Sequence, residues 1–513
     1  MDNYIKEEAC VRVQAALCDK QVMTELSSDF SLPDYQPEIK RLLRVRATVA
    51  PPDKYIGAGS AEFSGTVDYS ILYSANDGAL YCATQTGEYQ FSIPMEMASD
   101  FELGDGVFCD VETVPDMTVG RVAAPRRLSV KCRLRSRVRL WGTRLLEERV
   151  GGAPTESIQR LRGSRESARM FVGSGEPLQL GDEILFDAQS ENLRVISADG
   201  AVYVSEALAG SGSVNCRGEV CLKLLCCRDG SGEAPQVQLR RIPFSQSVMT
   251  DGAEVNCDCT ARGVCSELNI TVEEGRILCE VTVRLETRAQ RNETVSYTRD
   301  LYSTAADGEV RYRSCVLPKA LKCTAGNFSL NTMLSMEEAG IRAGQSIVDL
   351  SLLPTVTELE CEHGKYILTG RCRCQAILAG EEDFSVQEFE IPFRYETDGT
   401  QEKATDYDAD VTPISCRARM DGERIAIDAE LAVNLSTRGQ SAFEMVSEAQ
   451  FGEGLAAAGA SYTICYPSRE DTLWSVAKRY HRAVSSIAEM NPLASSPSAD
   501  AGDSLAGVSY LLV

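Results

Sequence analysis

The chain has 513 residues, of which 43% are hydrophobic and 25% charged, a balance that argues against a disordered chain and predicts about three or four folded domains. Its net charge of −23 disfavours nucleic acid and anionic membranes as partners. The sequence has no signal-peptide pattern and no apolar run of the ~18 residues that a membrane helix needs. We therefore expect a cytoplasmic protein without membrane insertion, in which the 20 cysteines are reduced.

The first distinctive stretch in chain order is residues 32–39, which contains two prolines. Pro37 suits the first position of a helix, because the residue there needs no backbone N–H. Leu42 and Leu43 continue an apolar stripe. We therefore predict a short helix after this stretch.

Three similar segments follow at a regular interval. Each is a β-type run that opens on a glycine, which permits a bend or a bulge, and the glycines are Gly65, Gly218 and Gly370, spaced by 153 and 152 residues. Two further markers keep the same order in every segment. They are a phenylalanine (Phe91, Phe244 and Phe393) and a late strand that begins at an arginine (Arg127, Arg276 and Arg424). Three markers at one interval indicate three copies of one domain rather than a solenoid of short repeats.

The copies are predicted to be antiparallel and sandwich-like. Their hydrophobic residues alternate with period two, and glycine turns such as 76–78 and 421–422 separate the runs. The predicted fold class is therefore mainly β, with three tandem domains over residues 1–150, 160–303 and 309–445. A linker over 446–461 and a small module over 462–513 complete the predicted organisation.

One strand of the first predicted domain carries a basic stripe. As a strand, residues 130–140 place five cations on one face: Lys131, Arg133, Arg135, Arg137 and Arg139. One interpretation is a docking face for an acidic protein. The favoured interpretation is a solvated face paired with acidic neighbours of the same chain, such as Asp110 and Glu112, because sheets commonly pair opposite charges.

Residues suited to catalysis or metal binding are few. His363 lies in a predicted hairpin turn and His481 follows a predicted helix, and neither has a catalytic triad or a metal-ligand spacing around it. The Cys-X-Cys pairs at 257–259 and 372–374 resemble the alternation of small buried residues on a strand, with metal or redox pairing as the weaker alternative. We therefore predict a protein that is not an enzyme, with no catalytic residue, metal site or cofactor.

The last fifty or so residues predict a small module of strand, helix, helix and strand. A short apolar strand leads into a turn and a helix in which Leu473, Val476, Ala477 and Tyr480 share one stripe. A second amphipathic helix ends near Pro492, and a final apolar run closes the chain.

Residues 471–480, Asp-Thr-Leu-Trp-Ser-Val-Ala-Lys-Arg-Tyr, resemble the most recognisable part of the LysM module. Residues 32–39, the three glycine-led runs and the three late strands resemble the SPOCS domains of spore-forming bacteria. Several SPOCS domains followed by one LysM is the arrangement of the SipL-type spore-coat morphogenetic proteins. The resemblance implies a non-enzymatic adaptor in the mother-cell cytoplasm, at the forespore surface, that docks spore-coat proteins such as a SpoIVA-like ATPase.

Family LysM modules bind N-acetylglucosamine chains in a shallow groove between two loops. By position, the resemblance implies that the groove residues are Glu470, Asp471, Thr472, Leu473, Asn491, Pro492 and Leu493. Glu470 stands where the family usually has glycine, and it adds bulk and charge at a turn where a ligand would approach the backbone. Protein docking is therefore the favoured hypothesis, and peptidoglycan binding at the cortex or cell wall is the alternative.

Overall fold

The computed structural model describes residues 7–57, 59–95, 101–102, 108–185, 193–228, 234–273, 275–381, 383–455, 462–491, 505 and 508–513. Long antiparallel strands make up most of this part of the chain, and two short α-helices lie near the C-terminus. The prediction of a mainly β fold is confirmed. Neither described helix has the length and apolar character that crossing a bilayer requires.

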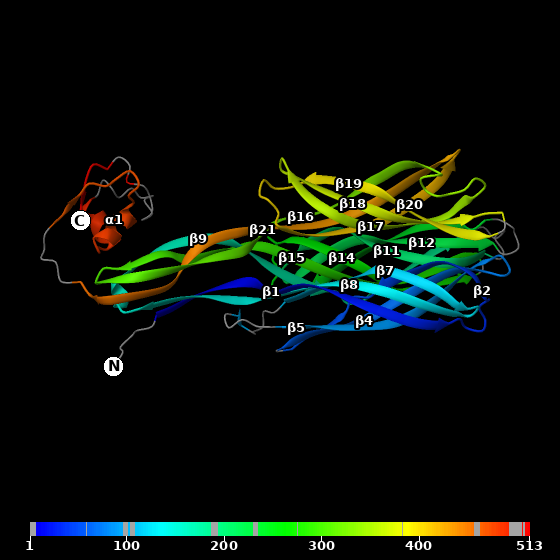
Figure 1. Ribbon diagram of the computed structural model, residues 1–513, viewed down its shortest axis with the longest axis horizontal. Coiled ribbons are helices and arrows are strands. Elements are labelled where there is room, and N and C mark those ends of the chain that lie inside the picture. The colour runs from blue at the N-terminus through cyan, green and yellow to red at the C-terminus, as the bar shows by residue number, and fades with distance from the viewer. Residues whose placement is uncertain are drawn as a thin grey trace.

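The strands form three successive groups that run along one elongated body (Figure 1). The first group contains β1 (Glu7–Ser31), β2 (Ile39–Val49), β3 (Asp53–Ile56), β4 (Ser60–Ala75), β5 (Leu80–Pro94), β6 (Phe101–Glu102), β7 (Phe108–Ala124) and β8 (Arg127–Gly151). The second contains a 3-10 turn (Thr155–Ser157), β9 (Ile158–Ser174), β10 (Leu178–Leu185), β11 (Leu193–Ala209), β12 (Ser213–Arg228), β13 (Gln236–Met249), β14 (Asp258–Glu273) and β15 (Arg276–Ser303). The third contains β16 (Ala306–Ser335), β17 (Ser346–Glu362), β18 (Lys365–Ala379), β19 (Phe384–Asp398), β20 (Asp406–Asp421) and β21 (Arg424–Gly454).

Each group is a two-layered sandwich. In the first, second and third groups, respectively, one layer is β2–β4–β5, β11–β12–β13 and β17–β18–β19, and β3 also pairs with β4. The other layer is, in the same order, β1–β8–β7, β14–β15 with β9 and β10, and β16–β21–β20. A core of buried side chains from both layers lies within each group. The layers face each other because alternate residues of a strand point to the same side and are apolar.

The middle strands β4, β12 and β18 each contain a glycine that is covered by an aromatic ring of the next strand. The cross-strand pairs are Gly65–Tyr89, Gly218–Phe244 and Gly370–Phe393. A Cβ atom at Gly65 would lie 2.8 Å from Tyr89 Oη, so glycine makes room for the ring. The predicted bulge lies beside two of these glycines, in the neighbouring strands β11 and β17. Phe91 is the wrong marker in the first group, because it pairs with Phe63 instead.

The three sandwiches pack side by side and share apolar clusters along a common axis. One axial cluster draws on all three groups and contains Leu43, Leu72, Leu80, Ile196, Leu225, Val348 and Ile377. Its members from β2, β11 and β17 recur at intervals of 153 and 152 residues, as do those from β4, β12 and β18. The groups therefore lie against one another and are not separate domains on a string.

Six long strands continue beyond the sandwiches as three two-stranded ribbons, β1–β8, β9–β15 and β16–β21 (Figure 1). The ribbons pack on one another through a second shared cluster: Val13, Leu146, Val295, Tyr297, Cys315, Leu317, Phe443 and Met445. A short parallel contact between β8 and β21 adds to this packing. The C-terminal helices lie at the far end of the ribbons.

The helix predicted after residues 32–39 is wrong, because Ile39–Val49 form strand β2. The pairing of β2 with β4 has two register shifts, and one lies between Leu42 and Arg44. Leu42 packs against the core of its own sandwich, whereas Leu43 joins the axial cluster. A bulged strand that is buried on both faces has adjacent apolar residues, which resemble helical spacing.

The connection to the terminal module begins later than predicted. Strand β21 continues to Gly454, and Val446, Ala449 and Phe451 are buried against the other ribbons. Residues 446–454 are therefore sheet and not linker, and residues 456–461 lie outside the described chain.

Candidate functional sites

The terminal module has the predicted order of elements: β22 (Ile464–Cys465), α1 (Leu473–Arg479), α2 (Val484–Met490) and β23 (Leu511–Leu512). Strands β22 and β23 pair antiparallel. A capping box starts α1, in which the Thr472 hydroxyl accepts from the Ser475 N–H at 3.1 Å and the Ser475 hydroxyl accepts from the Thr472 N–H at 2.9 Å. The apolar side of α1, including Trp474, is buried in a small core.

The first loop of the predicted groove is held by bonds inside the module. The Asp471 carboxylate accepts hydrogen bonds from the Ser468 backbone N–H at 2.8 Å and from Arg479 at 2.6 Å, which together hold its pKa below the usual range. Thr472 is the helix cap and Leu473 is buried. Glu470 alone among these four is exposed.

The second loop of the predicted groove is also structural where it is described. The Asn491 amide donates to the carbonyl oxygens of Ile487 and Leu512 and accepts from the Leu512 N–H, each at 2.8 Å, and so ties α2 to β23. Pro492 and Leu493 lie outside the described residues. Within the described chain, no hydrogen bond or ion pair joins residues 470–473 to Asn491.

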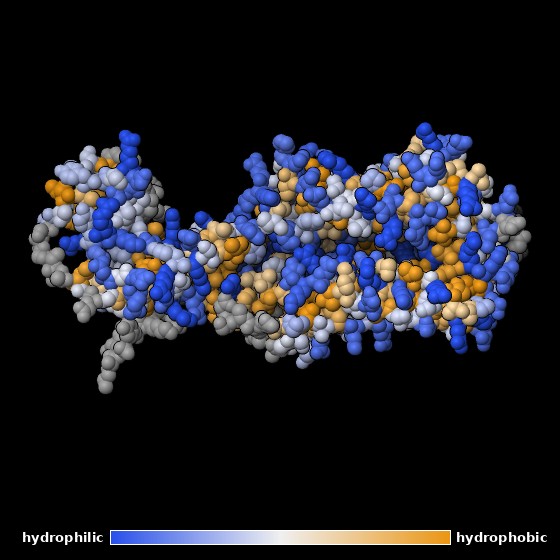
Figure 2. Space-filling view, viewed as in Figure 1, coloured by the Kyte–Doolittle hydropathy of each residue, from blue (hydrophilic) through white to orange (hydrophobic). Residues whose placement is uncertain are grey.

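A different surface of the module is exposed and aromatic. Tyr462, Ile464, Tyr466 and Tyr510 are between 54% and 81% exposed. Cys465 and Leu511, which alternate with them along the two paired strands, are buried. Alternation therefore places the four exposed residues, called here the tyrosine face, on the outer side of the β22–β23 strand pair. Apolar residues reach the surface at this end of the body (Figure 2).

The module is attached to the ribbons through Asp300 at the end of β15. The Asp300 carboxylate accepts hydrogen bonds from Trp474 Nε1 at 2.8 Å, Lys478 Nζ at 2.7 Å and the Tyr312 hydroxyl at 2.7 Å. Burial opposes its ionisation, but these donors outweigh burial and the pKa of Asp300 is lower than usual. Tyr302 adds an edge-to-face contact with Trp474, with ring centroids 4.8 Å apart.

His481 belongs to the same attachment. Its Nδ1 lies 2.9 Å from the Ser303 carbonyl oxygen, and its Nε2 lies 3.0 Å from the Asp307 carboxylate. The other histidine, His363, occupies the predicted hairpin turn with a φ of 49°. Both histidines thus have structural positions in the described chain.

The basic stripe of β8 lies largely against the chain itself. Arg133 pairs with Asp116, Arg137 with Asp19, Asp406 and Asp408, and Arg139 with Asp110 and Asp408. Lys131 is exposed and Arg135 is half-buried. The predicted pairing with acidic neighbours occurs for Arg133, Arg137 and Arg139, but Arg139 is buried rather than solvated, and the partners include the third sandwich. Glu112, expected to pair with this stripe, pairs with Arg262 at 3.2 Å instead.

These arginines belong to a charge cluster on the axis that connects all three sandwiches. Asp408 of β20 meets Arg139 of β8 at 2.7 Å, Arg438 of β21 at 2.9 Å and Arg288 of β15 at 3.7 Å. Burial opposes ionisation of Asp408 and Asp110, but the arginines outweigh burial and hold both carboxyl pKa values far below the usual range.

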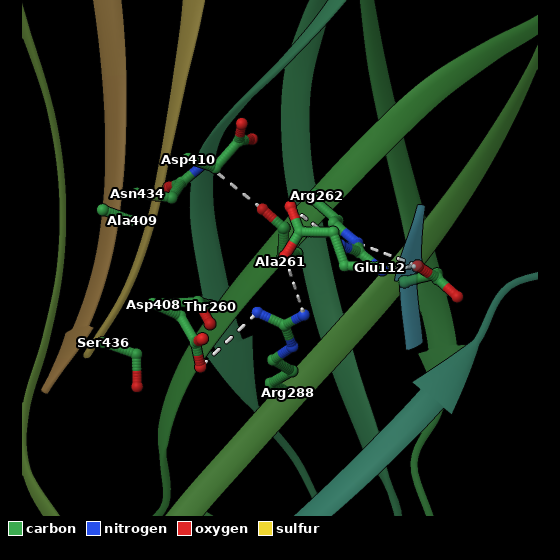
Figure 3. A pocket seen from close by; sticks show the side chains of 11 residues that line it. Glu112, Thr260, Ala261, Arg262, Arg288, Asp408, Ala409, Asp410, Asn434 and Ser436 are labelled. Atoms are coloured by element: carbon green, nitrogen blue, oxygen red, sulfur yellow. Dashed lines mark hydrogen bonds and ion pairs between the residues drawn. The ribbon is translucent and has the colours of Figure 1, made fainter. Parts of the chain in front are cut away.

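A small cavity lies beside this cluster, with Arg288 aimed at Asp408 and Arg262 at Glu112 (Figure 3). Its volume is about 30 Å³, which is room for about two water molecules. A cavity of this size excludes an organic substrate, so the cluster is a structural lock between sandwiches. The alternation of arginines in β8 was the sequence signal for this charge cluster. It did not indicate which carboxylates the arginines would meet.

The cysteines of the described chain are suited to packing. Cys372 and Cys374 are fully buried in the third sandwich, and burial raises the pKa of the Cys372 thiol to about 11. The thiol is therefore protonated and weakly nucleophilic at neutral pH. Among the described residues, no group of three or more histidine, cysteine, aspartate or glutamate side chains is arranged to hold a metal ion.

Comparison of the chain with protein-family models, with curated proteins and with solved structures found no match.

Proposed function

We propose that the chain is a non-enzymatic spore-coat morphogenetic adaptor. In this proposal, three copies of a SPOCS-like β domain form the scaffold and a LysM-like module at one end presents the docking face. The partners are coat proteins at the forespore surface in the mother cell, among them a SpoIVA-like ATPase.

The arrangement of the scaffold supports three copies of one domain. Each sandwich has the same order of layers and one glycine covered by a cross-strand aromatic ring. Residues spaced by 153 and 152 positions meet in one axial cluster. Equivalent positions of three copies would meet in this way around an approximate threefold axis.

The tyrosine face is the observation that carries the docking proposal. Exposed aromatic and aliphatic residues that gather on one face are typical of protein interfaces, because they bury large areas with little loss of side-chain freedom. The polar groups of the predicted groove, by contrast, are engaged within the module. In this proposal, docking therefore uses the tyrosine face and not the groove.

Binding of the purified SpoIVA-like ATPase to the full-length chain tests the proposal. The double variant Tyr466→Ala/Tyr510→Ala should weaken binding by about tenfold or more, and a chain that ends before residue 462 should not bind. Tyr55→Ala is the matched control, because Tyr55 is 69% exposed on β3, outside the module. Equal binding by the double variant and the wild-type chain would contradict the proposal.

Peptidoglycan remains the alternative ligand, because exposed tyrosine rings also pack against sugar rings. Retention on purified peptidoglycan that is lost in the Tyr466→Ala/Tyr510→Ala variant would favour this alternative. Thr472→Ala and Asn491→Ala are poor tests, since both remove bonds that hold the module together.

A further inference from the structure

A cavity of about 410 Å³ opens between the second and third ribbons. It lies among β9, β15, β16 and β21, and its lining shares no residue with the tyrosine face or the axial charge cluster. Its volume falls within the range of small-molecule sites, about 300–1,000 Å³.

The floor of the cavity is aromatic. Tyr297 and Phe443 are almost completely buried and their ring centroids lie 4.2 Å apart. Gly163 allows this arrangement, because a Cβ atom there would lie 2.8 Å from Cζ of Tyr297. Only 3% of Tyr297 and 7% of Phe443 is exposed, so a ligand ring can contact these exposed parts but cannot stack on the whole face of either ring.

The walls of the cavity are cationic. Arg165 and Arg299 both line it and are exposed. Arg160 and Arg311 of the same ribbons form ion pairs with Glu148 and Glu448, whereas Arg162 and Arg313 donate hydrogen bonds to Thr298 and to the Glu147 carbonyl oxygen. No ion pair of Arg165 or Arg299 occurs within the described residues, although the chain has 75 acidic and 52 basic residues. Two guanidinium groups without a carboxylate partner attract a carboxylate ligand.

Irregular pairing opens the strands at this point. The register of β15 against β9 shifts between Thr298 and Asp300, which leaves Arg299 as the extra residue of a bulge. The register of β16 against β21 shifts next to Tyr312, another lining residue. Bulges re-aim side chains and are frequent beside functional sites.

We propose that this cavity binds a small aromatic carboxylate, with the ring against the exposed parts of Tyr297 and Phe443 and the carboxylates at Arg165 and Arg299. The remaining acidic lining residue, Glu444, is exposed at the wall and repels the ligand's carboxylates. It limits affinity, so removal of its charge strengthens binding. The proposal goes beyond a scaffold role and does not depend on it.

Isothermal titration of the full-length chain with isophthalate, a benzene ring with two carboxylates, tests the proposal. Saturable binding is expected, weaker by about tenfold in Arg165→Gln and in Arg299→Gln. Glu444→Gln should bind about threefold more tightly, a gain that misfolding cannot produce. Arg311→Gln, an exposed arginine of the same ribbons outside the cavity, should bind as the wild-type chain does.

Two results would overturn the proposal. One is the absence of saturable isophthalate binding at millimolar concentrations. The other is binding that acetate displaces equally well, or that both arginine variants retain, since either shows that the aromatic floor or the guanidinium pair is not the site.

Discussion

Gly218 shows how one missing side chain allows two strands and a ring to pack together. A Cβ atom there would contact the Tyr203 carbonyl oxygen and lie 2.8 Å from Cζ of Phe244. The carbonyl belongs to the neighbouring strand and cannot rotate away. The glycine therefore determines how closely β11 approaches β12.

Gly218→Ala should lower the free energy of unfolding by about 1–3 kcal/mol, because the added methyl group overpacks this contact. The midpoint of urea unfolding measures the change. Gly181→Ala in β10 is the control, since a Cβ atom there meets no other atom within 4 Å and its backbone is extended. An equal loss of unfolding free energy in the two variants would contradict the role of Gly218 in the close packing of β11, β12 and Phe244.

Asp300 joins the ribbons to the terminal module, because its carboxylate accepts from both Trp474 and Lys478. Asp300→Asn removes the charge that faces Lys478 and should weaken the contact between the terminal module and the ribbons by about 1–3 kcal/mol. Quenching of Trp474 fluorescence by acrylamide in a Trp141→Phe background reports how closely the terminal module is held against the ribbons. Glu309→Gln, an exposed neighbour paired with Arg311, should leave the quenching unchanged.

The contact between the terminal module and the ribbons should also depend on pH, and it should weaken in acid. The pKa of Asp300 is lower in the folded chain than in the unfolded one, so its contribution is complete at neutral pH. The contribution declines as pH falls below the unfolded value of about 3.9 towards the folded pKa. Trp474 quenching should therefore rise in acid in the wild-type chain and change little in Asp300→Asn.

Among the elements, β8 shows that a single strand can serve two interfaces. Its apolar residues, such as Leu128, Val130 and Leu134, fill the core of the first sandwich. Its arginines on the other face meet carboxylates of the third sandwich. The strand therefore links folding of one sandwich to assembly with the next.

Arg139→Ala should destabilise the chain by about 3–5 kcal/mol, because it leaves Asp110 and Asp408 short of a buried partner. Lys131→Ala on the same strand should change stability by less than about 0.5 kcal/mol, since Lys131 is exposed. Thermal unfolding compares the two. A similar small effect of both variants would contradict the proposed lock.

Much of the element content could be predicted from the sequence, because period-two alternation and glycine turns are local signals. The helix after residues 32–39 was predicted wrongly, since Leu42 is buried in the core of its own sandwich and Leu43 in the axial cluster, and the second burial depends on the other sandwiches. Phe91 was predicted as the marker, but Tyr89, on the same face of the same strand, is the residue paired with Gly65, and only the pairing partner distinguishes the two.

The candidate sites were predicted less well than the strands. The groove residues were assigned by resemblance, and their internal hydrogen bonds depend on the folded module. The tyrosine face had a readable signal, the alternation of Tyr462, Ile464 and Tyr466 around Cys465, which was not used. The Asp300 contacts join residues about 175 positions apart, and no local pattern in the sequence indicates them.

At the scale of the molecule, the three sandwiches form one body. Apolar clusters shared by all three groups lie on the axis and along the ribbons, and the arginine–carboxylate cluster also connects all three. The terminal module is held at the end of the ribbons by Asp300 and Tyr302. A body built in this way can present the tyrosine face at a constant position relative to the scaffold, as an assembly adaptor requires.

Small-angle X-ray scattering of the full-length chain tests this organisation most directly. Sandwiches packed side by side predict one compact, elongated particle, with a constant cross-section and a bell-shaped Kratky plot. Three separate domains on a string predict a longer particle, with several maxima in the distance distribution and a Kratky plot that stays high at wide angles. The first result agrees with the shared axis, and the second would contradict it.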